Sequence, residues 1–138
     1  TFNTASLVNV TTGSPNFFQL TILDYEEGYP SFTSASYTTG EASGSIIIYV
    51  DRISGSNGAL SVDYSTVNGT AVSGTNYTKT TGTLSWIDQD PATIKSITIP
   101  VGYDGLYGTN KYFTVDLSDL STGSFSFYPS AISSSTIT

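Results

Sequence analysis

Strict alternation of apolar and polar side chains is the feature that most constrains this chain, and it is clearest over residues 60–65. Leu60, Val62 and Tyr64 fall on one side of an extended segment, and polar residues lie between them. A side-chain period of two is the geometry of a β-strand with one buried face. The segment then runs into Asn68-Gly69, a pair typical of tight turns between strands. The stretch therefore predicts a half-buried strand that enters a tight surface connection.

Short apolar segments separated by turn residues recur along the whole chain. The predicted strands cover residues 17–23, 32–37, 45–52, 59–64, 82–87, 94–101 and 112–117, with closing strands at 124–128 and 132–138. No segment shows the 3.6-residue period of an amphipathic helix. Short strands at regular spacing predict an all-β fold, an antiparallel β-sandwich. The expected core residues are Leu84, Trp86, Ile97, Ile99, Val101, Phe113, Val115 and Leu117.

Composition closes off most enzyme chemistries. The 138 residues fit one domain and include no cysteine, histidine or methionine, so thiolate nucleophiles, imidazole bases and soft metal ligands are all missing. Four basic residues stand against eleven acidic ones, and the net charge of −7 repels phosphate backbones. We therefore expect neither an enzyme nor a nucleic-acid partner. A hard cation such as calcium, bound by oxygen atoms, stays open.

Surface features point to an extracellular protein. Few lysines and arginines, many small hydroxyl residues and ten tyrosines favour an extracellular, cell-surface or virion-surface location, and no apolar run approaches the ~20 residues of a membrane span. Asn9, Asn68 and Asn76 each begin a glycosylation sequon. A glycan ligand also stays open, because tyrosines stack well on sugars. The candidate tyrosines are Tyr25, Tyr29, Tyr103, Tyr107 and Tyr128.

Seven short segments between residues 44 and 117 carry a resemblance to a known family by their order and spacing. They are residues 44–52, 62–64, 68–71, 74–77, 82–84, 97–104 and 113–117. The most specific piece is the block from Asp63 to Ala71, followed by Gly74-Thr75-Asn76-Tyr77. From about Phe32 to Thr138 the chain resembles a Calx-beta domain. The resemblance implies an immunoglobulin-like sandwich of about seven strands, found in tandem in surface adhesins and in sodium/calcium exchangers, where it binds calcium.

The resemblance also implies a site, which this chain matches incompletely. Glu41 matches the glutamate before the first long strand, and Asp104 is the one acid of the expected cluster after the strand that ends near residue 101. Asn68 and Asn76 stand where the family has aspartates, and Lys111 adds a positive charge. The candidate metal ligands are therefore Glu41, Asn68 and Asp104. Two carboxylates are few for calcium, so no cofactor is expected and calcium is left as an alternative.

Residues 1–28 precede the resembling part, which we assign to residues 29–138. The extension contains the predicted strand 17–23 and then an acidic loop over residues 24–30. We expect this additional β segment to pair with a neighbouring copy, a neighbouring repeat or an open sheet edge, because an unpaired strand edge is a ready template. The candidate strand-addition residues are Phe2, Leu7, Val8, Val10, Phe18, Leu20 and Ile22.

Three functions follow from the sequence. The favoured one is a non-enzymatic structural or adhesive module, serving as a subunit or repeat of a surface fibre, filament or virion-surface assembly. The first alternative is a calcium-binding Calx-beta module. The second is a carbohydrate-binding module, which would require exposed aromatic side chains gathered in one concave site.

Overall fold

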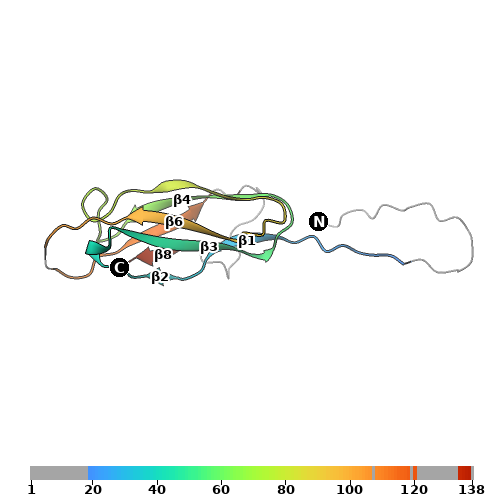
Figure 1. Ribbon diagram of the computed structural model, residues 1–138, viewed down its shortest axis with the longest axis horizontal. Coiled ribbons are helices and arrows are strands. Elements are labelled where there is room, and N and C mark those ends of the chain that lie inside the picture. Colours follow the sequence, from blue (N-terminus) through green and yellow to red (C-terminus); the bar gives the residue numbers. More distant parts are fainter. Residues whose placement is uncertain (1–18, 107, 119, 121–133, 138) are drawn as a thin grey trace, which may run out of the picture.

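The computed structural model describes residues 19–106, 108–118, 120 and 134–137, and this part of the chain is a two-sheet sandwich (Figure 1). Its elements are β1 (Glu27–Phe32), β2 (Ser36–Tyr37), the 3-10 helix η1 (Glu41–Ser43), β3 (Ser45–Gly55), β4 (Leu60–Asn68), β5 (Thr81–Trp86), β6 (Ile94–Pro100), β7 (Phe113–Ser118) and β8 (Ser134–Ile137). One sheet has the order β1-β3-β6, and the other has the order β2-β8-β7-β4-β5. Every pairing is antiparallel except β2 with β8. The predicted all-β sandwich is confirmed.

The core lies between the two sheets and is built by alternation along each strand. In β3, Ile46, Ile48 and Val50 are buried, whereas Ile47 and Tyr49 between them are exposed. Burying one large aliphatic side chain stabilises a fold by about 1.5–3 kcal/mol, so this alternation fixes which face of each strand turns inward. Seven of the eight predicted core residues are buried, and the eighth, Val101, is half-buried against the same cluster.

One end of the sandwich, which we call the turn end, is held together by the buried side chain of Arg52. This end comprises the start of β1, the β3–β4 turn and the β5–β6 turn. The Arg52 guanidinium donates to the carbonyl oxygens of Glu27 at 2.9 Å, Asn57 at 2.8 Å and Ile87 at 3.4 Å. Only 4% of the residue is exposed, so these carbonyls replace the water that a buried cation loses. Arg52 thereby links the three segments.

The N-terminal part differs from the prediction. Gln19 to Leu23 form no strand, so the predicted strand 17–23 is wrong over these residues, and residues 17 and 18 lie outside the described part. The first strand is instead β1, which begins inside the expected acidic loop. A close backbone contact at Gly28 allows a strand to form at this position. Gly28 has φ +70° and lies so close to β3 that an added Cβ would be 2.4 Å from the Gly55 carbonyl oxygen.

The predicted strand 124–128 lies outside the described residues. No helix in the described part of the chain is long and apolar enough to cross a membrane.

Candidate functional site

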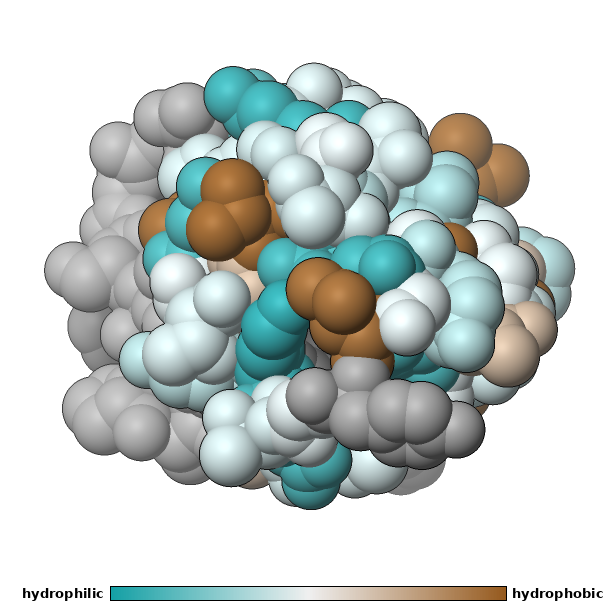
Figure 2. All heavy atoms as spheres, turned by 90° about the vertical axis from the view of Figure 1, so that its left-hand side faces the viewer, coloured by the Kyte–Doolittle hydropathy of each residue, from teal (hydrophilic) through white to brown (hydrophobic). Residues whose placement is uncertain are grey.

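The opposite end of the sandwich, which we call the loop end, carries a pocket of about 460 Å³. Three connections form this end: residues 38–44 with η1, residues 69–80 between β4 and β5, and residues 101–112 between β6 and β7. Glu41, Asn76, Leu106 and Lys111 are among the residues that line the pocket. Figure 2 shows the loop end head-on: hydrophilic and neutral residues cover most of it, interrupted by separate hydrophobic ones. The pocket is lined by both polar and apolar residues.

Phe113 lines the pocket and stacks on Tyr77. The rings of Tyr77 and Phe113 are nearly parallel, with their centroids 4.0 Å apart. Tyr77 is only 3% exposed, and burial raises the pKa of its phenol. The Tyr77 hydroxyl donates to Asn68 Oδ1 at 2.6 Å, and the Ser73 backbone N–H donates to the same oxygen at 3.0 Å. Asn68 thus holds the connection after β4 in place, and its oxygen is already used.

Asp104 is the acidic centre of the loop end. Its Oδ2 accepts from Lys111 Nζ at 2.9 Å and from Asn76 Nδ2 at 3.1 Å, and its Oδ1 accepts from the Leu106 backbone N–H at 3.0 Å. Its side chain is 9% exposed, against 38% for Lys111. The Lys111 ammonium, with help from the Leu106 N–H, holds the pKa of Asp104 below its usual value. Asp104 is therefore an ionised carboxylate that a lysine already neutralises.

The three predicted ligands are not gathered into one cluster. Glu41 lines the pocket, Asp104 reaches it through Asn76, and Asn68 is engaged in the turn below. The described residues contain no group of three or more acidic, histidine or cysteine side chains placed to hold a metal ion. Calcium takes about six to eight oxygen ligands. Any calcium ion here would rely on Glu41, Asp104, amide and carbonyl oxygens and water.

Two residues that shape this site were not predicted as ligands. Asn76 appeared only as a sequon and a lost aspartate, yet it links the 69–80 connection to Asp104, and its own Oδ1 accepts from Val72 N at 3.0 Å. Lys111 appeared only as an added charge, although it forms the ion pair of the site. The available signal was its position as the one lysine in the loop that carries Asp104.

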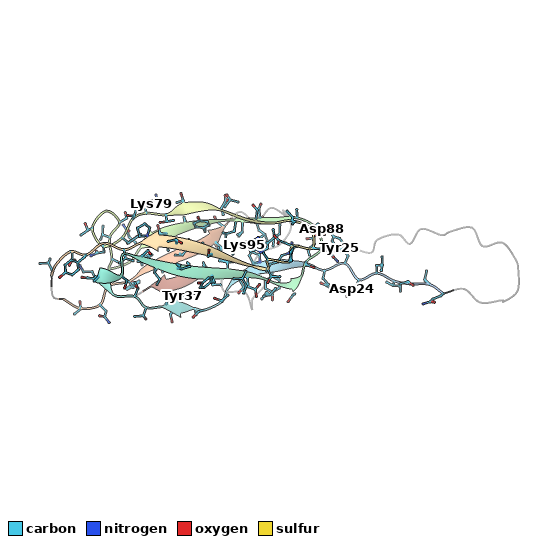
Figure 3. The ribbon with its side chains drawn as sticks, in the orientation of Figure 1. Asp24, Tyr25, Tyr37, Lys79, Asp88 and Lys95 are labelled. Atoms are coloured by element: carbon cyan, nitrogen blue, oxygen red, sulfur yellow. The ribbon has the colours of Figure 1, made fainter. Side chains whose placement is uncertain are left out.

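The sequons and tyrosines are distributed as follows. Asn9 lies outside the described residues, Asn68 is exposed, and the Asn76 side-chain nitrogen, which would carry a sugar, donates to Asp104. Tyr25 lies at the turn end (Figure 3), whereas Tyr103 belongs to the connection between β6 and β7 at the loop end. Because exposed tyrosines are at opposite ends, these two cannot form one concave glycan site. Tyr107 and Tyr128 lie outside the described part.

The candidate strand-addition residues are only partly described. Leu20 and Ile22 are 60% and 84% exposed. The others lie outside the described residues: Phe2, Leu7, Val8, Val10 and Phe18.

Comparison with known proteins gives one family. The sequence model of the Calx-beta domain matches residues 24–138, and the match begins just before β1. A search of the curated proteins finds no match.

Several solved structures share the fold. The apo form of the Calx CBD1 domain is 26% identical with a TM-score of 0.68, and the alignment covers 78% of this chain and 93% of that one. The calcium-binding domain CBD12 of CALX1.1 is 25% identical with a TM-score of 0.67, over 80% of this chain and 45% of that one. The Calx CBD2 domain, at 18% identity and a TM-score of 0.67, shows the fold alone over 82% of this chain and 86% of that one.

Proposed function

We propose that this chain, which belongs to the Calx-beta domain family, is a non-enzymatic module that binds calcium weakly at the loop end. The observation that carries the proposal is the ionised, nearly buried carboxylate of Asp104 beside a pocket that Glu41 and Asn76 line. A similar structure, that of CBD12 from CALX1.1, is described as a calcium-binding domain. The same end of the sandwich is where the family resemblance places a metal.

The affinity follows from the charges at the loop end. Glu41 and Asp104 supply two negative charges, and the Lys111 ammonium cancels one of them at 2.9 Å. Calcium would have to displace this ammonium or share Asp104 with it. We therefore expect a dissociation constant of about 10⁻⁴–10⁻³ M, which is the range of extracellular calcium modules.

Calorimetric titration of the full chain with calcium tests the proposal. The unmodified protein should bind in the submillimolar to millimolar range. Lys111→Gln should bind more tightly because the competing ammonium is gone, and Asp104→Asn should not bind. Lys79→Gln is the matched control, since it removes the same charge from an exposed lysine that forms no ion pair among the described residues.

If neither the unmodified chain nor Lys111→Gln binds calcium at about 10 mM, the calcium proposal is wrong. Equal tightening in Lys79→Gln and Lys111→Gln would show a general charge effect, which would remove the role given to the loop end.

A second candidate is a structural or adhesive module of a surface fibre, filament or virion-surface assembly in an extracellular location. The Lys111–Asp104 ion pair is compatible with a module that works without a metal, because the lysine neutralises the Asp104 carboxylate. Electron microscopy of the native material tests this candidate. Filaments or capsid decoration would support it, and discrete monomers would contradict it.

A further inference from the structure

Residues Gln19 to Leu23, which we call the tail, form an apolar segment without a partner in the described chain. Leu20, Ile22 and Leu23 are 60%, 84% and 86% exposed, and none of the five residues is charged. Three neighbouring aliphatic side chains in water are unfavourable, whereas an uncharged segment of this kind can be covered at no cost in buried charge. The tail therefore has the composition of a strand that pairs elsewhere.

The direction of the tail is fixed at its root. Asn57 in the β3–β4 turn donates through its backbone N–H to the Glu26 carbonyl at 2.9 Å and through Nδ2 to the Asp24 carbonyl at 3.3 Å. Figure 3 shows Asp24 and Tyr25 at the turn end, and in Figure 1 residues 19–23 run away from the sandwich along its long axis. Because its root is anchored at the turn end, the tail points away from its own sandwich.

The matching surface lies on β6, whose only neighbouring strand in the described part of the chain is β3. At the end of β6, Thr78 N donates to Pro100 O at 2.9 Å, so the open part of the edge covers Ile94 to Thr98. Arg52 N donates to Thr93 O, and Val101 N donates to Gly44 O, so the odd-numbered residues of this ladder bond to β3. Antiparallel bonding alternates from residue to residue. Ile94, Ser96 and Thr98 therefore direct their backbone N–H and C=O groups at the open edge.

The outer face beside this edge carries three exposed apolar side chains, together with Asp51, Ser96 and Thr98. Ile94 is 51% exposed, and Ile47 and Tyr49 on the adjacent β3 are 46% and 43% exposed. The β6 residues that pair with Ile47 and Tyr49 are the small Thr98 and Ser96, so side chains of an added strand could reach over them. The strand β5 is an edge of the second sheet, and its exposed positions carry only hydroxyl residues: Thr81, Thr83 and Ser85.

We propose that the tail of one molecule adds as a strand to the open edge of β6 on a second copy of this chain, with Leu20 and Ile22 over the face of Ile47, Tyr49 and Ile94. The donor and the acceptor edge lie on different surfaces of each molecule, so the contact is head-to-tail and can continue into longer assemblies. The net charge of −7 opposes association, so salt should promote it. This inference is independent of calcium binding.

Sedimentation velocity of the full chain over a range of concentrations and salt tests the proposal. The unmodified chain should associate, and more so at 0.5 M than at 0.05 M salt, on the order of a severalfold change in the associated fraction. Leu20→Lys with Ile22→Lys should weaken association by about tenfold or more, which corresponds to ~1.4 kcal/mol. Val67→Lys with Val72→Lys is the control and should associate normally, because it has the same net charge and replaces aliphatic side chains that are 44% and 48% exposed and do not line the pocket.

A proline pair locates the acceptor edge. Ser96→Pro removes an N–H that points to the open edge of β6 and leaves every bond to β3 in place. Ser85→Pro is the equivalent change on β5. There Thr66 N donates to Thr80 O, so the even-numbered residues of β5 bond to β4 and the N–H of Ser85 points outward. Circular dichroism confirms that each variant folds. Loss of association in Ser96→Pro alone supports the proposal. Loss in Ser85→Pro alone overturns it, as does an unmodified chain that stays monomeric or a tail double variant that associates normally.

Discussion

The side chain of Asn68 holds the turn after β4 by two hydrogen bonds that an aspartate would also accept. The donors are the Ser73 N–H and the buried Tyr77 hydroxyl. The geometry of the turn is therefore kept while one negative charge is removed from the loop end. This explains how the turn can look like the family pattern in sequence and still contribute little to a metal site.

Substitutions of Asn68 should separate geometry from charge. Asn68→Ala leaves the Tyr77 hydroxyl without an acceptor and should lower the free energy of unfolding by about 1–3 kcal/mol. Asn68→Asp keeps both hydrogen bonds and should change the free energy of unfolding much less. Urea denaturation measures both, and an equal loss in the two variants would mean that the oxygen of Asn68 does not hold the turn.

The ion pair of Asp104 predicts a pH dependence. The pKa of Asp104 is lower in the folded chain than in the unfolded one, mainly because of Lys111. Its contribution to stability is therefore present above the ordinary aspartate pKa and is lost as the pH falls through the folded value. In Lys111→Gln, the pKa of Asp104 should move back toward the ordinary aspartate value. The free energy of unfolding should then decrease less than in the unmodified chain as the pH is lowered from about 5. Carbon-13 titration of the Asp104 carboxyl measures the pKa directly, and an unchanged pKa in the variant would contradict the assigned cause.

At the scale of elements, alternation identified some strands and failed for others. β3 and β6 were predicted because their inward positions are filled by large aliphatic residues. β1 was missed because its sequence contains Gly28 and Pro30, which argue against a strand interior. Pro30 is fully buried on an edge strand, where no second ladder needs its missing N–H. The pairing of β1 depends on backbone contact, which no side-chain pattern reports.

Gly28→Ala tests that explanation. The alanine would have to adopt φ near +70°, with its Cβ 2.4 Å from the Gly55 oxygen. We expect a loss of about 1–3 kcal/mol in the free energy of unfolding, and loss of amide protection in β1 by hydrogen exchange. Gly108→Ala is the control, because a Cβ there meets no atom within 4 Å. Equal stability of the two variants would show that β1 tolerates a side chain at residue 28.

For the whole molecule, the fold was predictable and the site only in part. Alternation over many strands is redundant, so errors at β1 and the tail did not alter the sandwich. The site depends on how three connections meet: Glu41, Asn76 and Asp104 come from separate loops, and the Lys111–Asp104 contact forms because one loop folds back on itself. Neither arrangement has a local sequence pattern.

The charge balance of the whole molecule predicts its response to ions. At −7 the chain repels itself, so sodium chloride should raise the melting temperature by screening. Calcium at ten times its dissociation constant should add about 1.4 kcal/mol beyond sodium chloride of equal ionic strength. Differential scanning calorimetry in the two salts makes the comparison. Identical melting temperatures would mean that calcium stabilises the chain only by screening its charges, without specific binding.

The chain enters β1 at the turn end, where Glu27 pairs with Gly55, and the described chain reaches the end of β8 at the loop end, where Ile137 pairs with Phe113. Tension applied through the tail and the C-terminal strand would therefore run along β1 and β8. When force acts parallel to a strand, the hydrogen bonds to its neighbour must break together. When force acts perpendicular to the strand, they break one after another. We therefore expect the sandwich to resist stretching along this axis. Arg52 links the start of β1, where the load would enter, to both neighbouring turns.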